Sequence, residues 1–327
     1  MDILVTGGAG YIGGGLLVKL GEEFPEATIT SLDNLTTGDY RHIKHLKKGK
    51  RHRLLVGDIR KKSDLKKATT QDTSMIVHLA AMPGVKLCND QPKDATDTNI
   101  YGTHLLLKEA VYHNAKRFVF TSSAAVYGTP EKHPIRERHP LNPINLYGVT
   151  KVSGEKLVNG CHITSGLNTT ILRLSNLYGL SAYTKWKTVV PKFVWQAVHN
   201  KALTIRADGK QQRNFVHVQD VIDAIIRCLK APQKAVAGET FNVGGEVLSV
   251  SQIAMTVIRE GRQRLGKDVP KVRTQLETGE VYTSEFNYDW RRASQKIGYR
   301  QKREVSEGVS ELFDYALKIK ATQAHED

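Results

Sequence analysis

The chain has 327 residues, enough for one large or two moderate domains with an extensive buried core. Its cysteines, Cys88, Cys161 and Cys228, are far apart and show no disulfide or metal-ligand spacing, so no metal site is expected. The net charge is +15, and the stretch 39–67 holds twelve Lys and Arg against three acidic residues. Because Tyr40 is the one aromatic residue there that could stack on a base, we expect a solvated lysine-rich surface and no nucleic-acid partner.

The first predicted element is a buried strand at Ile3, Leu4 and Val5, and apolar residues at helical spacing follow from Ile12 to Leu20. No basic and apolar leader precedes this strand, and no stretch is long and apolar enough to span a membrane. We therefore expect a cytoplasmic protein without a membrane partner.

A glycine-rich turn, GGAGYIG at 7–13, separates that strand from the helix. Gly7 would form the tight turn, Gly10 would let the backbone approach a pyrophosphate, and Gly13 would let the helix pack closely on the strand. The start of the helix, with Tyr11 and Ile12, offers free N–H groups to the phosphates. A purely structural glycine turn is the alternative interpretation.

A carboxylate suited to complete this site is Asp33, twenty residues after Gly13 at the end of a predicted strand over 28–32. An acidic residue there accepts hydrogen bonds from the adenosine ribose and repels a 2′-phosphate, which favours NAD over NADP. The alternative is that Asp33 merely caps the turn. We expect NAD as the cofactor.

Buried strands then alternate with amphipathic segments. The predicted strands are 54–56, 75–77, 118–120 and 170–172, and the predicted helices lie near 99–114 and 150–166. This alternation is typical of an α/β protein with a Rossmann-type doubly wound parallel sheet.

The regular alternation loosens after Arg173, where Tyr183 to Lys187 is typical of a loop. We therefore predict an NAD-binding domain over 1–174 and a second, smaller α/β substrate domain over 175–327. The segment 214–246 could return to the first domain. A ligand crevice is expected between the two.

Tyr147 and Lys151 are four residues apart and would share one face of a helix. The ammonium favours the phenolate and would lower its pKa from roughly 10, which makes a general base for a sugar hydroxyl. Ser123, in TSSAAVYG at 121–128, follows a buried strand and would face the same substrate oxygen. A surface helix pair is the alternative for Tyr147 and Lys151.

Together these motifs resemble the extended short-chain dehydrogenase/reductases, within the NAD-dependent nucleotide-sugar epimerase/dehydratase family. The resemblance covers nearly the whole chain: TGGAGYIG, the acid in LDNLTTG, GDI at 57–59, HLAA at 78–81, NIYGT at 99–103, TSSAAVYG, YGVTK, RLSNLYG at 173–179, ADGKQQRNFVHVQDV at 207–221 and FNVGG at 241–245. It implies that the chain binds NAD and a nucleotide-diphosphate sugar.

The resemblance also implies residue roles. The catalytic residues would be Ser123, Tyr147 and Lys151. Contacts to the cofactor would come from the glycine turn and from Asp33, Asn34, Asp58, Ile59, Ala80, Ala81, Asn99, Tyr147 and Lys151. Contacts to the substrate would come from Lys86, Ser123, Tyr147, Asn176, Val190 and Arg213. Asn176 as a turn residue and Arg213 as a solvated surface charge are the plainer alternatives.

The residues after Ser123 narrow the reaction. Family dehydratases place Asp-Glu there, and the decarboxylases keep the glutamate, whereas this chain has Ala124 and Ala125. We therefore predict C4 epimerisation of a nucleotide-linked hexose, UDP-glucose/UDP-galactose first. A UDP-glucuronate or other nucleotide-sugar 4-epimerase, a 4-keto-sugar reductase and a non-catalytic dinucleotide or nucleic-acid binder are the alternatives.

The chain departs from the family pattern at three places. Gly14 and Gly15 replace the usual Ser-His, no proline follows Tyr178-Gly179, and residues 277–280, ETGE, stand where an Arg-Pro-Gly-Asp-like phosphate contact is common. AAMPGVKLCNDQP at 80–92 is similar to the uronate epimerases, with Lys86 in place of their arginine and Cys88 in place of a serine.

The predicted helices near 99–114 and 150–166 carry more apolar residues than one sheet face needs. They include Ile100, Leu105, Leu106, Leu107, Val111, Val152, Leu157 and Val158. Two such helices can pair with their symmetry mates in a four-helix bundle, so we expect a homodimer. The alternative is that the sheet and the neighbouring helix bury both stripes.

Overall fold

The structure is a computed structural model that describes residues 1–49, 51–206, 208–266, 272–275 and 286–323. Residues 277–280, where the sequence departs from the family pattern, lie outside the described residues. No helix in the described part of the chain combines the length and apolar character needed to cross a bilayer.

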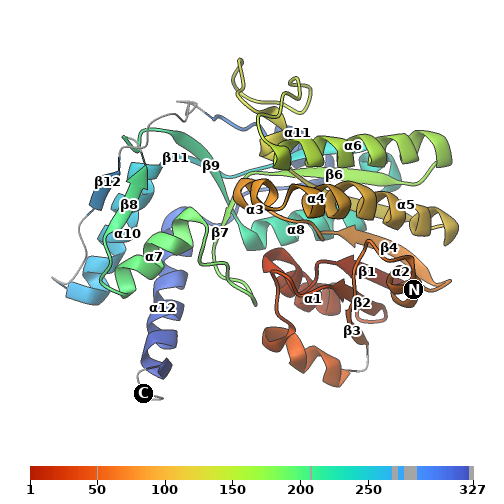
Figure 1. The fold of residues 1–327 in the computed structure, drawn as a ribbon, viewed down its shortest axis with the longest axis horizontal. Coiled ribbons are helices and arrows are strands. Elements are labelled where there is room, and N and C mark those ends of the chain that lie inside the picture. Colours follow the sequence, from red (N-terminus) through yellow and green to blue (C-terminus); the bar gives the residue numbers. More distant parts are fainter. Residues whose placement is uncertain (50, 207, 267–271, 276–285, 324–327) are drawn as a thin grey trace.

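The strands are β1 (Asp2–Thr6), β2 (Thr28–Asp33), β3 (His52–Val56), β4 (Thr73–His78), β5 (Arg117–Ser123), β6 (Thr169–Leu174), β7 (Asn176–Tyr178), β8 (Leu203–Arg206), β9 (Gln212–His217), β10 (Glu239–Val243), β11 (Glu246–Ser249) and β12 (Val272–Gln275). The helices are α1 (Tyr11–Glu23), α2 (Lys62–Ala68), α3 (Val85–Asp90), α4 (Pro92–Thr96), α5 (Thr103–Tyr112), α6 (Leu146–Ser165), α7 (Val189–Val198), α8 (Val218–Lys230), α9 (Gln233–Val236), α10 (Val250–Leu265), α11 (Arg291–Ile297) and α12 (Val305–Gln323). Three short irregular helices, η1 (Tyr40–Gly49), η2 (Asp97–Gly102) and η3 (Ala124–Tyr127), complete the elements (Figure 1).

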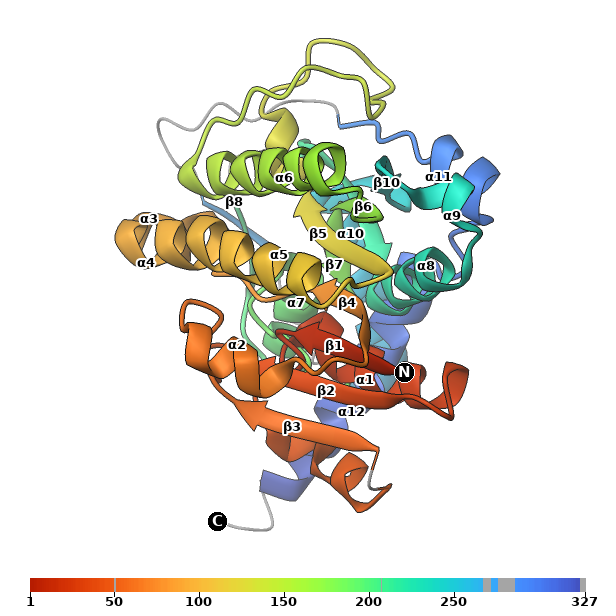
Figure 2. The same cartoon turned by 90° about the vertical axis from the view of Figure 1, so that its right-hand side faces the viewer.

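A seven-stranded sheet in the order β10-β6-β5-β4-β1-β2-β3 forms the centre of the molecule (Figure 2). Every pairing in it is parallel. The predicted apolar runs lie inside its strands because a parallel sheet is covered on both faces. The expected Rossmann-type doubly wound sheet is confirmed.

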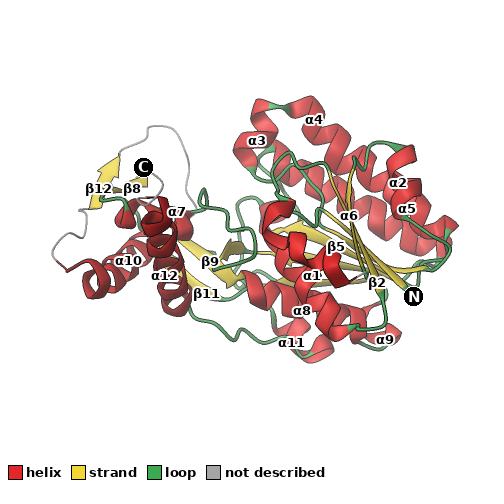
Figure 3. Cartoon of the chain, turned by 90° about the horizontal axis from the view of Figure 1, so that it is seen from below, coloured by secondary structure: helices red, strands yellow, loops and turns green. Residues whose placement is uncertain are grey.

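Helices cover both faces of this sheet (Figure 3). Ile3 and Val5 of β1 belong to one core, with α1 and α8, whereas Leu4 belongs to a second core, with α2 and α5. Alternate residues of a strand point to opposite faces, so one short apolar run supplies both cores.

The chain after β6 forms a second layer of structure. A mixed sheet β11-β9-β7 and a pair β12-β8 lie beside α7, α10 and α12, which share a separate core that includes Phe193, Val257 and Phe313. Within the range 214–246, β10 pairs with β6 of the large sheet, whereas β9 does not. The division into domains at residue 174 stays a prediction.

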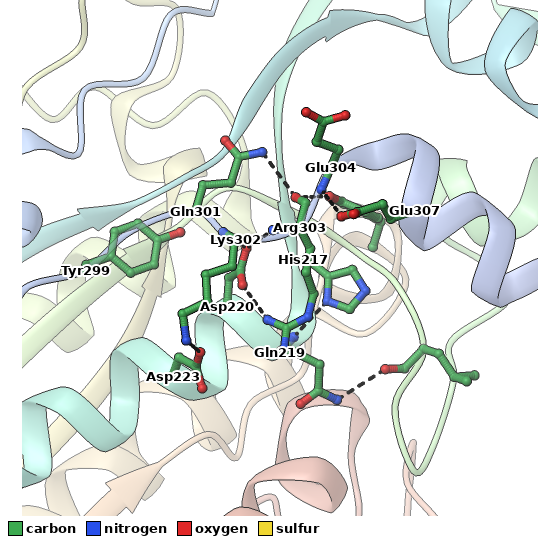
Figure 4. Close-up of polar contacts among 12 residues, drawn as sticks. His217, Gln219, Asp220, Asp223, Tyr299, Gln301, Lys302, Arg303, Glu304 and Glu307 are labelled. Carbon is green, nitrogen blue, oxygen red and sulfur yellow. Dashed lines mark hydrogen bonds and ion pairs between the residues drawn. The ribbon is translucent and has the colours of Figure 1, made fainter.

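Buried Asp220, near the start of α8, ties this helix to the segment that leads into α12 (Figure 4). Its Oδ1 accepts a hydrogen bond of 2.6 Å from the Arg303 guanidinium, and its Oδ2 accepts one of 3.0 Å from the Lys302 backbone N–H. A buried carboxylate must find such partners. The contacts therefore fix the second layer against the large sheet.

Candidate active site

A cleft of about 450 Å³ opens where the strands of the large sheet end. Its N-terminal half is formed by residues that follow β1 to β4, its C-terminal half by residues 174–188, and the end of β5 and the start of α6 lie between them. Ligands of doubly wound sheets bind at this edge. The predicted residues that line it are Gly7, Gly10, Tyr11, Ile12, Gly13, Asp33, Asn34, Ile59, Ala80, Ala81, Ser123, Tyr147, Lys151 and Asn176.

The glycine turn has the shape that a dinucleotide needs. Gly7 has a φ of +77°, and a Cβ added there would lie 2.6 Å from the Ala80 backbone nitrogen. A Cβ on Gly13 would lie 2.3 Å from the Gly7 carbonyl oxygen, which explains why helix and strand require glycine at this contact. A Cβ on Gly10 would lie 3.3 Å from the same carbonyl oxygen, a tight contact but a much milder one than at Gly13. These residues fit a pyrophosphate at the start of α1.

Asp33 ends β2 beside this turn. Its Oδ2 accepts a 3.0 Å hydrogen bond from the Ala9 N–H, and its Oδ1 accepts one of 2.8 Å from the Leu35 N–H. Burial raises the pKa of Asp33, and the two backbone hydrogen bonds oppose that rise. Each carboxylate oxygen keeps acceptor capacity, so the group fits the ribose hydroxyls of an adenosine.

Lys151 is a residue of α6, and its side chain is buried against β5. Its Nζ donates a 2.8 Å hydrogen bond to the Thr121 carbonyl and lies 5.9 Å from the centre of the Tyr147 ring. Burial lowers the pKa of Lys151 to about 8, and the nearby Cys88 and Glu155 oppose that fall. Helix α6 holds both residues because Asn145 caps its first turn by accepting a 2.9 Å hydrogen bond from the Gly148 N–H.

The Tyr147 phenol lies within reach of Ser123. Burial raises the pKa of Tyr147 to about 12, and a hydrogen bond with the Ser123 side chain lowers it in part. The predicted fall of this pKa is therefore wrong for the cofactor-free protein, because desolvation of the phenolate outweighs the hydrogen bond with Ser123. A further positive charge at this site would favour the phenolate.

Ser123 lies at the last position of β5. Its Oγ accepts a 3.2 Å hydrogen bond from the Ala125 N–H and so caps the short helix η3. Among the described residues that line the cleft, the acidic ones are Asp33 and Asp94. Asp94 pairs at 2.7 Å with Arg60, which places it beside the N-terminal half.

Five predicted residues do not line the cleft. Asn99 is buried in the wall, where it accepts a 2.7 Å hydrogen bond from the Met82 N–H. Asp58 pairs with Arg60 at 2.7 Å. Lys86 extends outward and pairs with Asp90 at 2.7 Å, Val190 lies in the core of the second layer, and Arg213 donates a 2.7 Å hydrogen bond to the Gln212 carbonyl.

Other cleft residues were not predicted. They are mainly loop residues, including Thr36, Thr37, Arg60, Gln91, Asp94, Tyr183, Lys185 and Thr188. The sequence located the loop at Tyr183 to Lys187 but contains no periodic pattern that would assign it to a site.

The comparisons with known proteins agree with this geometry. Residues 3–244 match the model of the NAD dependent epimerase/dehydratase family. The chain is 31% identical over 316 residues to a putative UDP-glucose 4-epimerase of Methanocaldococcus jannaschii, which covers 96% of this chain and 97% of that protein. It is also 31% identical over 260 residues to human dTDP-D-glucose 4,6-dehydratase, over 79% of this chain and 73% of that protein.

A solved structure shows the same fold. The UDP-glucuronic acid 4-epimerase of Bacillus cereus, in complex with UDP-glucuronic acid and NAD, matches with a TM-score of 0.85 and 27% identity, over 98% of this chain and 100% of that chain. The match to the family model over most of the length and the likeness to these relatives show that the chain belongs to the NAD-dependent epimerase/dehydratase family.

Proposed function

We propose that the protein epimerises a nucleotide-linked hexose at C4, with UDP-glucose and UDP-galactose as the first candidates. The observation that carries this proposal is the group formed by Ser123, Tyr147 and Lys151 at the cleft, with Ala124 and Ala125 directly after Ser123. The group can move a hydroxyl proton, and neither of the two residues after Ser123 is acidic.

Each residue of the chain has a defined task in this reaction. The Tyr147 phenolate accepts the proton of the 4-hydroxyl, and the Ser123 hydroxyl holds the same oxygen. Lys151 stabilises the phenolate. NAD, which the glycine turn and Asp33 would hold, would supply the oxidant for removal and return of the C4 hydrogen. Return of the hydrogen to the other face of the 4-keto sugar completes the epimerisation.

The cleft favours this reaction over dehydration. Loss of water across C5 and C6 needs a base at C5 and an acid at the C6 hydroxyl. The acidic residues that line the described part of the cleft, Asp33 and Asp94, belong to its N-terminal half. Neither is placed for that task beside Ser123.

UDP-glucuronate is a second candidate, because of Lys185. This half-buried lysine lines the C-terminal half of the cleft, and within the described residues no carboxylate forms an ion pair with it. Burial, and then Lys187, lower the pKa of Lys185, so an anion bound there would favour its charged form. The sugar carboxylate of a uronate is such an anion.

The test mixes the purified protein with catalytic NAD and UDP-galactose. We expect UDP-glucose to form without net change at the reduced-nicotinamide absorbance band, and a parallel reaction with UDP-glucuronate addresses the second candidate. Stoichiometric use of reduced cofactor would indicate a 4-keto-sugar reductase. Inactivity on every nucleotide sugar, together with tight and salt-sensitive RNA binding, would favour a non-catalytic binder.

We also propose a homodimer through α5 and α6. Leu105 to Leu107 and Val158 are buried within the chain, so the apolar surplus is smaller than predicted. However, Tyr101, Val111, Val149 and Ile163 remain exposed on this side of the molecule, on η2 and on these two helices. Sedimentation at low micromolar concentration tests the dimer, and a fully active monomer would contradict it. The cytoplasmic location stays a prediction.

A further inference from the structure

The C-terminal half of the cleft depends on residues 179–188, which we call the cleft segment. It follows β7 and places Tyr183, Lys185 and Thr188 along the cleft. Its first four residues contact Tyr11 and helix α1, which adjoin the cofactor turn, and also helices α8 and α12.

Gly179 begins the segment in a conformation that requires glycine. Its φ is +99°, and a Cβ there would lie 2.0 Å from the His217 Nε2, so the backbone passes flat against that imidazole. The Gly179 carbonyl accepts a 2.6 Å hydrogen bond from the Tyr11 hydroxyl. Burial raises the pKa of Tyr11, so its phenol remains a donor through the physiological range. Tyr11 directly follows Gly10 and itself lines the cleft.

Leu180 is held by two further elements. Its carbonyl accepts a 3.3 Å hydrogen bond from Gln219 near the start of α8, and its N–H donates to Glu311 of α12. Glu311 also lies 3.3 Å from His217 Nε2. The His217 ring in turn caps α8 by accepting a hydrogen bond from the Gln219 N–H (Figure 4). Helices α8 and α12 therefore hold the same residue.

The unusual glycines of α1 make the next contact. A Cβ on Gly14 would lie 3.1 Å from the Ala182 Cβ, and one on Gly15 would lie 3.0 Å from the Ser181 Oγ and 2.8 Å from Ile222. The missing side chains let the cleft segment lie directly on the cofactor helix. The departure from Ser-His at these positions thus has a packing reason.

We infer that Tyr11 and Gln219 are positioning residues that hold the cleft segment, so that a dinucleotide bound at the glycine turn orders the part of the cleft that receives the nucleotide sugar. Tyr11 is the link, because one side of it lines the cleft and its hydroxyl holds Gly179. The identity of the second ligand rests on the proposed function. The coupling between the two halves of the cleft is independent of the proposed function.

The test compares amide hydrogen exchange in the whole protein with and without NAD. Tyr11→Phe removes one hydroxyl and keeps the ring. Tyr40→Phe is the matched control, since it removes a phenol whose partners, Ser31 and the Leu55 carbonyl, lie outside the cleft segment. We expect exchange at 179–188 to be about fivefold faster in Tyr11→Phe, as for the loss of one hydrogen bond, and unchanged in Tyr40→Phe.

NAD should slow exchange at residues 7–13 in all three proteins, but at 179–188 it should slow exchange less in Tyr11→Phe. A second readout is the KM for the nucleotide sugar, which should rise several-fold while kcat falls less. Gln219→Met repeats the test from α8 if Tyr11→Phe does not fold.

Equal exchange at 179–188 in the Tyr11 and Tyr40 variants would overturn the inference. Wild-type protein that turns over no nucleotide sugar would overturn the proposed function instead, and the exchange data would still decide the coupling.

Discussion

The two halves of the cleft are built in different ways. In the N-terminal half, contacts that define the cofactor turn are close in sequence, such as Gly13 against Gly7 and Asp33 against Ala9, although Gly7 also packs on Ala80. The C-terminal half depends on distant contacts, such as Tyr11 with Gly179 and Gln219 with Leu180. The first half therefore has a spacing that a sequence reveals, whereas the second exists only after the fold has formed.

Ser123, Tyr147 and Lys151 lie between the two halves of the cleft, and a substitution in this group should have the largest effect on turnover. Tyr147→Phe removes the proposed base, and turnover should fall by roughly 10²–10⁴-fold, the usual contribution of general base catalysis. NAD content of the purified variant, measured after denaturation, should match the wild type. Turnover near the wild-type rate would exclude Tyr147 as the base.

In the N-terminal half, two glycine substitutions distinguish the packing of the glycine turn from its contact with the cofactor. Gly13→Ala places a Cβ 2.3 Å from the Gly7 carbonyl oxygen, so the free energy of unfolding should fall by about 1–3 kcal/mol and NAD should be lost. Gly10→Ala would place its Cβ 3.3 Å from the same oxygen, a milder contact, so it should lose less stability than Gly13→Ala and still lose NAD affinity. Thermal unfolding and NAD titration measure both. Equal stability of the two variants would contradict the packing assigned to Gly13.

The Lys151 ammonium should make the stability of the cofactor-free protein depend on pH. Its pKa falls to about 8 in the folded protein from 10.5, so between these values the unfolded chain binds the extra proton. The free energy of unfolding should therefore gain up to ~1.4 kcal/mol per pH unit from this group as pH rises above 8. Burial raises the pKa of Cys88 and Cys228, so these thiols oppose the rise over the same range, and the contribution of Lys151 is read as a difference in slope between variants. The measurement stops near pH 10, where tyrosines of the unfolded chain titrate.

Lys151→Met should reduce that rise, whereas the control Lys156→Met, at an exposed position of the same helix, should not. Denaturant unfolding at several pH values measures the difference. The same slope in the wild type and in Lys151→Met would show that this lysine keeps its ordinary pKa.

The smallest expected effect concerns the C-terminal half. Lys185→Met removes its half-buried cation, and the KM for UDP-glucuronate should rise about tenfold, the loss of one charge-assisted contact. The KM for UDP-galactose should change less, because its sugar is neutral. Steady-state kinetics on both substrates measures this, and equal changes would remove Lys185 from the contacts with the sugar carboxylate.

Much of the fold follows from short apolar runs. Ile3 to Val5 and Phe118 to Phe120 lie inside β1 and β5 because buried parallel strands need unbroken apolar sequence. The pairing of β10 with β6 brings residue 241 beside residue 172. The sequence allowed for a return of the segment 214–246, but no local pattern sets its partner strand.

The residues of the candidate site likewise divide into those that the sequence pattern predicts and those that it does not. Gly7, Gly13 and Asp33 follow from spacing, and Ser123 follows from the end of a strand. Lys86 was predicted from a motif alone, and it lies outside the cleft because its helix directs it to Asp90. Lys185 was not predicted because it lies in a loop, and a loop has no hydrophobic periodicity that would assign its residues to a site.

The most direct measurement of the central claim is the reaction of UDP-galactose in ²H₂O. If hydrogen only leaves C4 and returns to it, the product is UDP-glucose that carries no deuterium on carbon, as read by mass spectrometry and proton resonance. Deuterium at C5 or C6, with a 4-keto-6-deoxy product, would show loss of water and contradict the account.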